Sequence, residues 1–326
     1  MRILVAGSGS IGRRHLHNLT GLDPGCSCLL LRADGREDEC SRQFQAQVVQ
    51  TVDQALADRI DAVLIATPSA QHADLLLEAI PAGLPVYVEK PVVTTGSDVL
   101  AVQAACERHG YHAASQVGCN LRLLPSLQRM RALVHEGAIG RVVRASLEAG
   151  QWLPDWRPQQ DHRHSYSADP ERGGGVIFDL IHELDAARWL LGELHPCACL
   201  SATVPALEIN SEAIAVALLR SEAGVLLQIG LDYVARRPLR RYQLVGDTGT
   251  LTWDLPGQRL ILDNARGSEL IDCGEQGFDV ALTYRKALAE FLKAVQSAGT
   301  TTQPIQEGLR SAALAIRLKE LACLNP

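Results

Sequence analysis

The chain has 326 residues, a length that suggests two domains rather than one. Apolar residues make up 47% and charged residues 21%, which argues against an intrinsically disordered chain. The net charge is −6 and no lysine or arginine stripe is present, so we expect no nucleic-acid partner.

The sequence opens directly on an apolar strand, with no signal-peptide pattern ahead of it and no run of about 18 apolar residues. We therefore expect a cytoplasmic protein with no membrane partner. Nine cysteines are scattered along the chain without a C-x-x-C pair. Buried, reduced thiols are the favoured interpretation, with both side chains of each C-x-C pair on one face of a strand.

The first predicted elements are a strand, a glycine-rich turn and a helix. The apolar run "ILVA" is typical of a buried parallel strand, and "GSGSIGRRH" follows it. Gly7 permits the tight turn, Gly9 lets the backbone approach a pyrophosphate, and Gly12 allows close helix packing. Ser10 and Ile11 lie in the same turn, at the helix N-terminus where free N–H groups bind phosphate. This order of elements predicts a dinucleotide site.

The next predicted strand, "CLLLR", ends at Arg32, where NAD-binding folds usually carry an acidic residue for the ribose hydroxyls. An arginine there can meet a 2′-phosphate, so the sequence slightly favours NADP over NAD. Alternatively, Arg32 stacks on the adenine or is solvated, and Asp34 binds the ribose.

Strands and helices then alternate as far as residue 118. Helices are predicted from "TVDQALAD", "SAQHADLLLEAIPAG" and "SDVLAVQAACERHG", the last capped by Ser97, and strands from "DAVLIATP", "LPVYVEKP" and "YHAASQVG". This alternation predicts a parallel, doubly wound sheet. We assign residues 1–118 to an α/β Rossmann domain that binds the dinucleotide.

Polar residues stand where these strands end, which is the edge at which open parallel sheets bind their ligands. The first group is Thr67, Pro68 and His72, and the second is Glu89 and Lys90. We expect both groups at the cofactor, with Lys90 directed toward its nicotinamide end. A third strand leads to Asn120 and Arg122, which are candidates for contact with substrate.

From "GRVVRASLEAGQWLP" onward, alternating strands dominate: "ACLSATVPAL", "AIAVALLRSEAGVLLQIGLDYV", "RRYQLVGDTGTLTWDL" and "RLILDN". The tight-turn signals "SEAG" and "GDTG" join neighbouring runs. Two helices are predicted near residues 283–298 and 305–322. Residues 119–326 are therefore predicted to form an α+β domain with a large, mainly antiparallel sheet that binds substrate and mediates oligomerisation.

Between these strands lies a helix that follows the triple glycine at 173–175. Its apolar stripe runs through Ile177, Leu180, Ile181, Leu184 and Leu191. Asp179 and His182, three residues apart, are expected to be neighbours on the polar face, with Asp185 turned further round. A histidine beside a carboxylate fits general acid–base chemistry. We expect no metal here, because zinc spacing is absent and arginines crowd the lead-in.

Together these residues resemble the Gfo/Idh/MocA oxidoreductase family, the relatives of glucose–fructose oxidoreductase and inositol dehydrogenase. The resemblance covers nearly the whole chain through "GSGSIGRRH", "ATPSAQH", "EKP", "NLR" and the helix of Asp179 and His182. It implies a catalytic and substrate-orienting set of Lys90, Asp179 and His182. It also implies a homodimer or homotetramer built on the C-terminal sheet. Many members separate the Asp and His by four residues, so the spacing of three puts the role of His182 in question.

The expected reaction is hydride transfer between a nicotinamide and a carbinol carbon of a sugar, a nucleotide or acidic sugar, or a cyclitol. His182 would accept the hydroxyl proton, Asp179 would orient it, and Lys90 would stabilise the developing alkoxide. Arg122, Arg157 and Arg163 are candidates for a substrate carboxylate or phosphate, or are ordinary surface charges. Two alternatives remain: a glycoside-cleaving enzyme that uses a transient oxidation by NAD, and a non-catalytic dinucleotide sensor.

Overall fold

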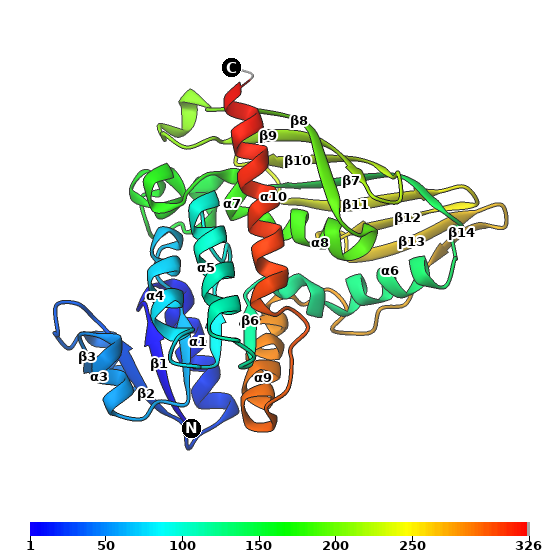
Figure 1. Ribbon diagram of the computed structural model, residues 1–326. Helices are drawn as coiled ribbons and strands as arrows, with labels where there is room; N and C mark the ends of the chain where they lie inside the picture. The colour runs from blue at the N-terminus through cyan, green and yellow to red at the C-terminus, as the bar shows by residue number, and fades with distance from the viewer. Residues whose placement is uncertain (325–326) are drawn as a thin grey trace. The chain divides into compact units, whose positions relative to one another are not determined.

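A computed structural model describes residues 1–324 and divides the chain into two compact units (Figure 1). Unit 1 contains residues 1–119 and 284–312, and unit 2 contains residues 120–283 and the segment from 313 onward. The chain first changes unit beside the predicted boundary at 118. The segment 284–312, which the sequence led us to expect in the second domain, belongs instead to unit 1.

Unit 1 is built on a six-stranded parallel sheet in the order β3-β2-β1-β4-β5-β6. The strands are β1 (Arg2–Ala6), β2 (Ser27–Leu31), β3 (Gln47–Val49), β4 (Ala62–Ile65), β5 (Val86–Val88) and β6 (Ser115–Val117). The order reverses at β1, which lies between β2 and β4, so the glycine turn after β1 stands at a topological switch point. The predicted doubly wound Rossmann sheet is confirmed.

Helices connect the strands of unit 1, and all of them except the short helix at Glu39–Gln43 were predicted from the sequence. They are α1 (Ser10–Leu22), α2 (Glu39–Gln43), α3 (Val52–Ala57), η1 (Ser69–Gln71), α4 (His72–Ala79) and α5 (Gly96–Arg108). The prediction of Ser97 as the cap of α5 is wrong. The N-cap lies two residues before Ser97, at Thr95, which accepts a hydrogen bond from the Asp98 N–H at 3.1 Å.

Two C-terminal helices, α9 (Val280–Ser297) and α10 (Ile305–Leu324), occupy the predicted positions. The loop between them docks on the edge strand β6 of unit 1. Val117 donates its N–H to Gln303 O at 2.9 Å, and Ile305 donates its N–H to Ser115 Oγ at 3.1 Å. The backbone of this loop thus satisfies polar groups that an edge strand would otherwise expose.

Unit 2 is built on an eight-stranded sheet in the order β14-β13-β12-β11-β7-β10-β9-β8. The strands are β7 (Val142–Gly150), β8 (Leu194–Ala202), β9 (Ile214–Ser221), β10 (Leu226–Asp232), β11 (Leu239–Gly246), β12 (Gly249–Asp254), β13 (Arg259–Asn264) and β14 (Gly267–Leu270). Every pair is antiparallel except β7 with β10. The predicted mainly antiparallel sheet is confirmed, although the exposed strand β14 was not predicted.

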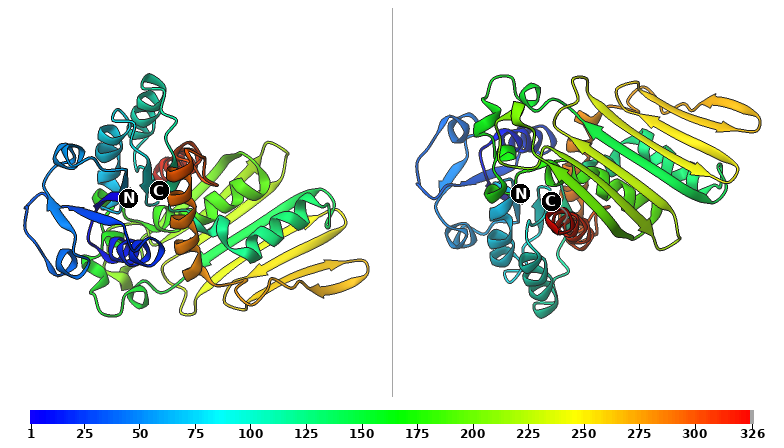
Figure 2. Two further views of the ribbon diagram at one scale, coloured as in Figure 1. Left: turned by 90° about the horizontal axis from the view of Figure 1, so that it is seen from below. Right: turned by 90° about the horizontal axis from the view of Figure 1, so that it is seen from above.

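One face of this sheet carries α6 (Pro125–His135) and α8 (Ile181–Leu191), as the two views of Figure 2 show. Every second residue along these strands points into the core beneath the helices, including the fully buried Tyr242 and Trp253. On the other face, apolar side chains of three neighbouring strands reach solvent. Among them are Leu200 (61% exposed), Leu218 (53%) and Leu226 (55%).

The predicted single helix after the triple glycine is divided in two. α7 (Val176–Asp179) ends where Leu180 leaves helical geometry, at φ −100° and ψ 32°, and α8 begins at the next residue. The predicted polar face is also wrong, because Asp179, His182 and Asp185 are each less than 9% exposed. Five short 3₁₀ segments of unit 2 precede α7 in the chain: η2 (Asn120–Leu123), η3 (Leu153–Trp156), η4 (His162–His164), η5 (Tyr166–Ala168) and η6 (Pro170–Arg172). A sixth, η7 (Pro205–Leu207), precedes β9.

All nine cysteines are free, but only part of the prediction about them holds. Cys28, Cys40, Cys119 and Cys199 are buried, whereas Cys197 and Cys323 are exposed. A register shift in β8 between Pro196 and Ala198 breaks the alternation, so Cys197 and Cys199 differ in exposure. Across residues 1–324, no helix has the length and apolar character needed to cross a membrane.

Candidate active site

The glycine turn of unit 1 has the geometry of a phosphate cradle. Gly7 has φ +106°, and a Cβ on it would lie 2.4 Å from Ala66 O. A Cβ on Gly12 would lie 2.0 Å from Gly7 O, so the fold itself requires both glycines. A Cβ on Gly9, in contrast, would meet no atom within 4 Å among the described residues. Gly9 therefore borders open space at the position where backbone must approach a ligand.

The N-terminus of α1 is built to receive an anion. Its N-cap is Gly9, so no side chain caps the N–H groups of the first turn, which contains Ser10 and Ile11. These N–H groups and the positive end of the helix dipole point toward the turn. The residues fit the pyrophosphate of a dinucleotide, as the sequence predicted.

Arg32 lies at the end of β2 and is held by two carboxylates. Its guanidinium donates to both oxygens of Asp34, at 3.1 and 3.0 Å, and also to Asp38. The N–H of Ser41 and the charge of Arg32 lower the pKa of Asp38, and the hydrogen bonds from Arg32 lower the pKa of Asp34. Both partners therefore stay ionised, and the arginine's charge is balanced locally.

The strand-end groups of β4 and β5 are joined through His72. This fully buried side chain lies with Nδ1 2.8 Å from Pro91 O and Nε2 3.0 Å from Thr67 O. Burial lowers its pKa, since the charged ring is excluded from water. His72 thus bridges the strand end at Thr67 and Pro68 to the one at Glu89 and Lys90 from inside the protein. Lys90 itself is half-buried.

In unit 2, Asp179 is the acceptor for two tyrosines. Tyr233 donates to Asp179 Oδ2 at 2.7 Å, and Tyr166 donates to Oδ1. Burial raises the pKa of both tyrosines, and the Asp179 charge raises it further. Both phenols therefore keep their protons. Asp179 is an anchored, acceptor-only carboxylate, and His182 lies three residues beyond it at the start of α8.

The sequence reasoning missed both tyrosines, although the strand pattern gave a signal for Tyr233. Tyr233 follows Leu227, Ile229 and Leu231 at the two-residue spacing of the buried face of β10. It therefore brings a hydroxyl group to a core-facing position. Tyr166 stands in the "SYSA" stretch ahead of the triple glycine, where nothing in the local pattern indicates its partner.

The candidate substrate residues of unit 2 lie in different settings. Arg157 places its guanidinium 5.6 Å from the centre of the Tyr166 ring, next to the Asp179 cluster. Arg122 is buried and pairs with Asp185, while Arg163 lies on the surface with Asp161 and Glu208. Asn120 is buried and donates to Thr283 Oγ1 at 2.7 Å. Of these four, Arg157 lies against the tyrosine that donates to the predicted catalytic aspartate.

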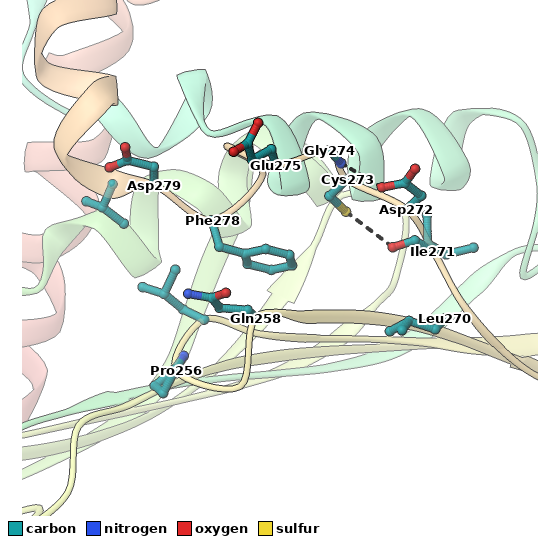
Figure 3. Close-up of a pocket in the computed structure, with 12 residues that line it drawn as sticks. Pro256, Gln258, Leu270, Ile271, Asp272, Cys273, Gly274, Glu275, Phe278 and Asp279 are labelled. Atoms are coloured by element: carbon teal, nitrogen blue, oxygen red, sulfur yellow. Dashed lines mark hydrogen bonds between the residues drawn. The ribbon is translucent and has the colours of Figure 1, made fainter.

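A pocket of about 880 Å³ lies elsewhere in unit 2, between the β12–β14 strands and the segment from Ile271 to Val280 (Figure 3). Phe278 lies between its walls, and the carboxylates of Asp272, Glu275 and Asp279 stand on one side. None of the predicted site residues lines this pocket. Nor do the described residues contain a cluster of three or more His, Cys, Asp or Glu side chains suited to a metal ion.

Two family models match this chain. Residues 1–116 match the NAD-binding Rossmann fold of an oxidoreductase family, and residues 127–252 match the GFO/IDH/MocA C-terminal domain. The two matches belong to the same family and together span most of the sequence.

Curated relatives agree with these matches. The chain is 30% identical over 258 residues to D-apiose dehydrogenase of Paraburkholderia graminis, covering 76% of this chain and 66% of that one. It is 27% identical over 290 residues to 1,5-anhydro-D-fructose reductase of Ensifer adhaerens, covering 84% and 81%. The match with the apiose enzyme thus spans just under two thirds of its length.

Solved structures agree on the fold. Levoglucosan dehydrogenase, in its complex with NADH and levoglucosan, superposes with a TM-score of 0.84 at 19% identity, covering 99% of this chain and 97% of that one. At this identity the likeness concerns the fold.

Proposed function

Because the chain belongs to the Gfo/Idh/MocA family of NAD-binding oxidoreductases, we propose that it transfers a hydride between NAD and a carbinol carbon of a small carbohydrate-like substrate. The observation that carries this proposal is the glycine turn with its uncapped helix N-terminus at the switch point of the unit 1 sheet. Bound there, NAD supplies the hydride-accepting carbon of its nicotinamide.

Within this family function, we propose a preference for NAD(H) over NADP(H). Arg32 stands where an arginine could meet a 2′-phosphate, but Asp34 and Asp38 already take its guanidinium donors. A phosphate placed here would have to displace or face two carboxylates. The local geometry therefore reverses the slight preference for NADP that the sequence suggested. Asp34, which is half-exposed, remains available for the ribose hydroxyls.

The proposed acid–base group is His182, which accepts the proton of the substrate hydroxyl as the hydride leaves. Asp179, held by hydrogen bonds from Tyr166 and Tyr233, accepts a hydrogen bond from the substrate. Lys90 stabilises the developing alkoxide. These three roles follow the family resemblance. The anchored Asp179 supports them, because a carboxylate with two phenol donors is pre-organised.

For the substrate, we propose a small polyhydroxylated molecule, since the relatives are named for apiose, anhydrofructose and inositol. An acidic or nucleotide-linked sugar would need a cationic partner, for which Arg157 is the best placed of the candidate arginines. Arg122 and Arg163 already form ion pairs with carboxylates of the protein itself.

The uncovered face of the unit 2 sheet, with Leu200, Leu218 and Leu226, would pair with a second copy in a homodimer or homotetramer. Nine free cysteines suit a reducing compartment such as the cytoplasm.

The first test is a parallel titration with NADH and NADPH, followed by nicotinamide fluorescence. We expect tight binding of NADH and weaker binding of NADPH, after which a panel of pentoses, anhydrosugars and inositols is screened for NADH production. Binding of neither dinucleotide by folded protein would contradict the proposal. Release of an aglycone without net NADH would instead identify a glycoside-cleaving enzyme. Binding without turnover, unchanged by substitution of Lys90 or His182, would identify a sensor.

A further inference from the structure

The residues on both sides of Lys90 are each held by a buried histidine, and the two histidines come from different helices. On one side, His15 of α1 donates from Nε2 to Glu89 Oε1 at 2.7 Å. On the other side, His72 of α4 lies 2.8 Å from Pro91 O. Both histidine side chains are 0% exposed.

His15 is fixed in place by its surroundings. Tyr87 of β5 packs edge-on against its ring, with centroids 4.8 Å apart, and Tyr87 packs in turn on Phe291 of α9. Within the described residues, Nδ1 of the His15 ring has no hydrogen-bond partner, and Nε2 bonds to Glu89. Because burying a polar side chain costs free energy unless it is hydrogen-bonded, the bond to Glu89 is what compensates for the burial of His15.

Glu89 is positioned as closely as His15. A Cβ on Gly118 would lie 2.6 Å from Glu89 Oε2, so only glycine at 118 leaves room for the carboxylate in this position. The backbone N–H of Lys90 lies 3.3 Å from the same oxygen. The carboxylate therefore connects His15 directly to the main chain of Lys90.

We infer that His15 and His72 are positioning residues for Lys90, holding the Glu89–Lys90–Pro91 turn from both sides. The inference rests on the proposed role of Lys90 in hydride transfer. A lysine carries its charge on a flexible four-carbon stem, so its backbone must be fixed if the ammonium group is to meet one substrate oxygen. His15 also lies on the helix whose N-terminus forms the glycine turn. The cofactor cradle and Lys90 thus share one rigid support.

The lysine content of the chain makes this inference testable without a known substrate. The sequence contains four lysines, Lys90, Lys286, Lys293 and Lys319. Acetylation by a limiting amine reagent, followed by peptide mass spectrometry, reports the reactivity of Lys90 against the exposed Lys293 in the same sample. This ratio reports the local setting of the Lys90 amine in folded protein, which a loss of stability alone would not change.

The informative variants are His15→Leu, which removes the donor, and His15→Gln, which keeps an N–H close to the position of Nε2. His17→Leu is the matched control, because His17 is exposed on the same helix. His72→Leu tests the other side, with the exposed His109→Leu as its control. We expect both buried leucine variants to change the Lys90-to-Lys293 labelling ratio at least about threefold, with His15→Gln close to wild type. In His15→Leu, NADH affinity should stay within about twofold, while in both leucine variants kcat on the substrate from the screen falls about 10- to 100-fold.

An unchanged labelling ratio and kcat in folded His15→Leu and His72→Leu would overturn the inference. If His15→Leu does not fold, Gly118→Ala displaces the carboxylate while leaving His15 in place, and the same two readouts decide. Lys90→Ala separates this inference from the proposed function. Full activity of Lys90→Ala would remove the catalytic role of Lys90 even if the histidine variants still change its labelling.

Discussion

The guanidinium of Arg122 meets the carboxylate of Asp185 through two 2.8 Å hydrogen bonds, with both side chains no more than 5% exposed. This pair joins η2 to α8 inside unit 2. Asp185 thus accepts from the two guanidinium donors of Arg122 that the sequence analysis assigned to a substrate anion. We therefore expect the loss of this ion pair to change the stability of the protein before it changes substrate binding.

Substituting Arg122 by Met should destabilise the protein by about 3–5 kcal/mol, because the buried carboxylate of Asp185 would lose its bidentate cationic partner. Urea unfolding gives the change in the free energy of unfolding. The double variant Arg122→Met/Asp185→Leu should recover much of the loss, since neither charge then remains buried. A stable Arg122→Met protein with a raised KM would instead support the substrate role.

Removing the hydroxyl of Tyr233 should affect both stability and turnover. Tyr233→Phe leaves one oxygen of Asp179 without its donor, at a cost of about 1–3 kcal/mol. The carboxylate keeps its hydrogen bond from Tyr166 but loses the one that fixes Oδ2, so kcat should fall more than NADH affinity does. Tyr111→Phe is the control: it removes a buried phenol that donates to Leu84 O at 2.7 Å in unit 1. Equal losses of kcat in the two variants would argue against a specific role for Tyr233.

The three glycines of the turn should respond differently to alanine. Gly12→Ala places a Cβ 2.0 Å from Gly7 O and should disrupt the fold. In Gly9→Ala the new Cβ has no neighbour within 4 Å elsewhere in residues 1–324, so the melting temperature should stay close to wild type. Its NADH affinity should nevertheless fall more than about tenfold, or about 1.4 kcal/mol, as the methyl group enters the phosphate position. Normal NADH binding by Gly9→Ala would place the dinucleotide elsewhere.

Cofactor preference should depend on the carboxylates around Arg32. The double variant Asp34→Ala/Asp38→Ala frees the guanidinium for a 2′-phosphate and removes two negative charges. The ratio of NADPH to NADH affinity should therefore rise at least about tenfold. Asp58→Ala, which removes a carboxylate partner of Arg2 instead, should leave the ratio unchanged. An unchanged ratio in the double variant would show that Arg32 does not face the ribose.

Stability should fall at alkaline pH because of the buried tyrosines. The pKa values of Tyr87, Tyr166, Tyr233 and Tyr242 are raised by burial. Above the unfolded pKa of about 10, unfolded tyrosines release protons that the folded ones retain. The unfolded state then binds fewer protons, so each such tyrosine lowers the free energy of unfolding by up to about 1.4 kcal/mol per pH unit. Urea titrations between pH 9 and 11 measure this slope, which Tyr233→Phe should reduce.

Most of the fold was readable from local pattern. The strand, glycine turn and helix around Gly7 follow directly from apolar runs and spacing, and the alternating strands of unit 2 gave its sheet. What periodicity could not show was burial of charge. From the sequence alone, an Asp or His in a helix predicts a solvent-exposed polar face. Asp179 and Asp185 are nevertheless buried, because Tyr233 and Arg122, which are distant in sequence, donate hydrogen bonds to them. Such pairs depend on tertiary partners that no local window contains.

The histidines illustrate the same limit. His15 sits at the helical spacing of Leu16 and Leu19, so its burial could be inferred from the stripe alone. Its contact with Glu89, 74 residues away, could not. The break between α7 and α8 at Leu180 also lacks a proline or glycine to announce it.

The docking of residues 301–305 on β6 has a consequence for the order in which the protein is made. The ribosome synthesises the six strands of unit 1 before unit 2, but the backbone partners of Ser115 and Val117 only after the sheet of unit 2. Gly308, whose Cβ would lie 2.5 Å from a methyl of Val92, arrives later still. Domains usually complete folding in the order of their synthesis. Here unit 1 is completed only after residues 120–283 of unit 2 have been synthesised.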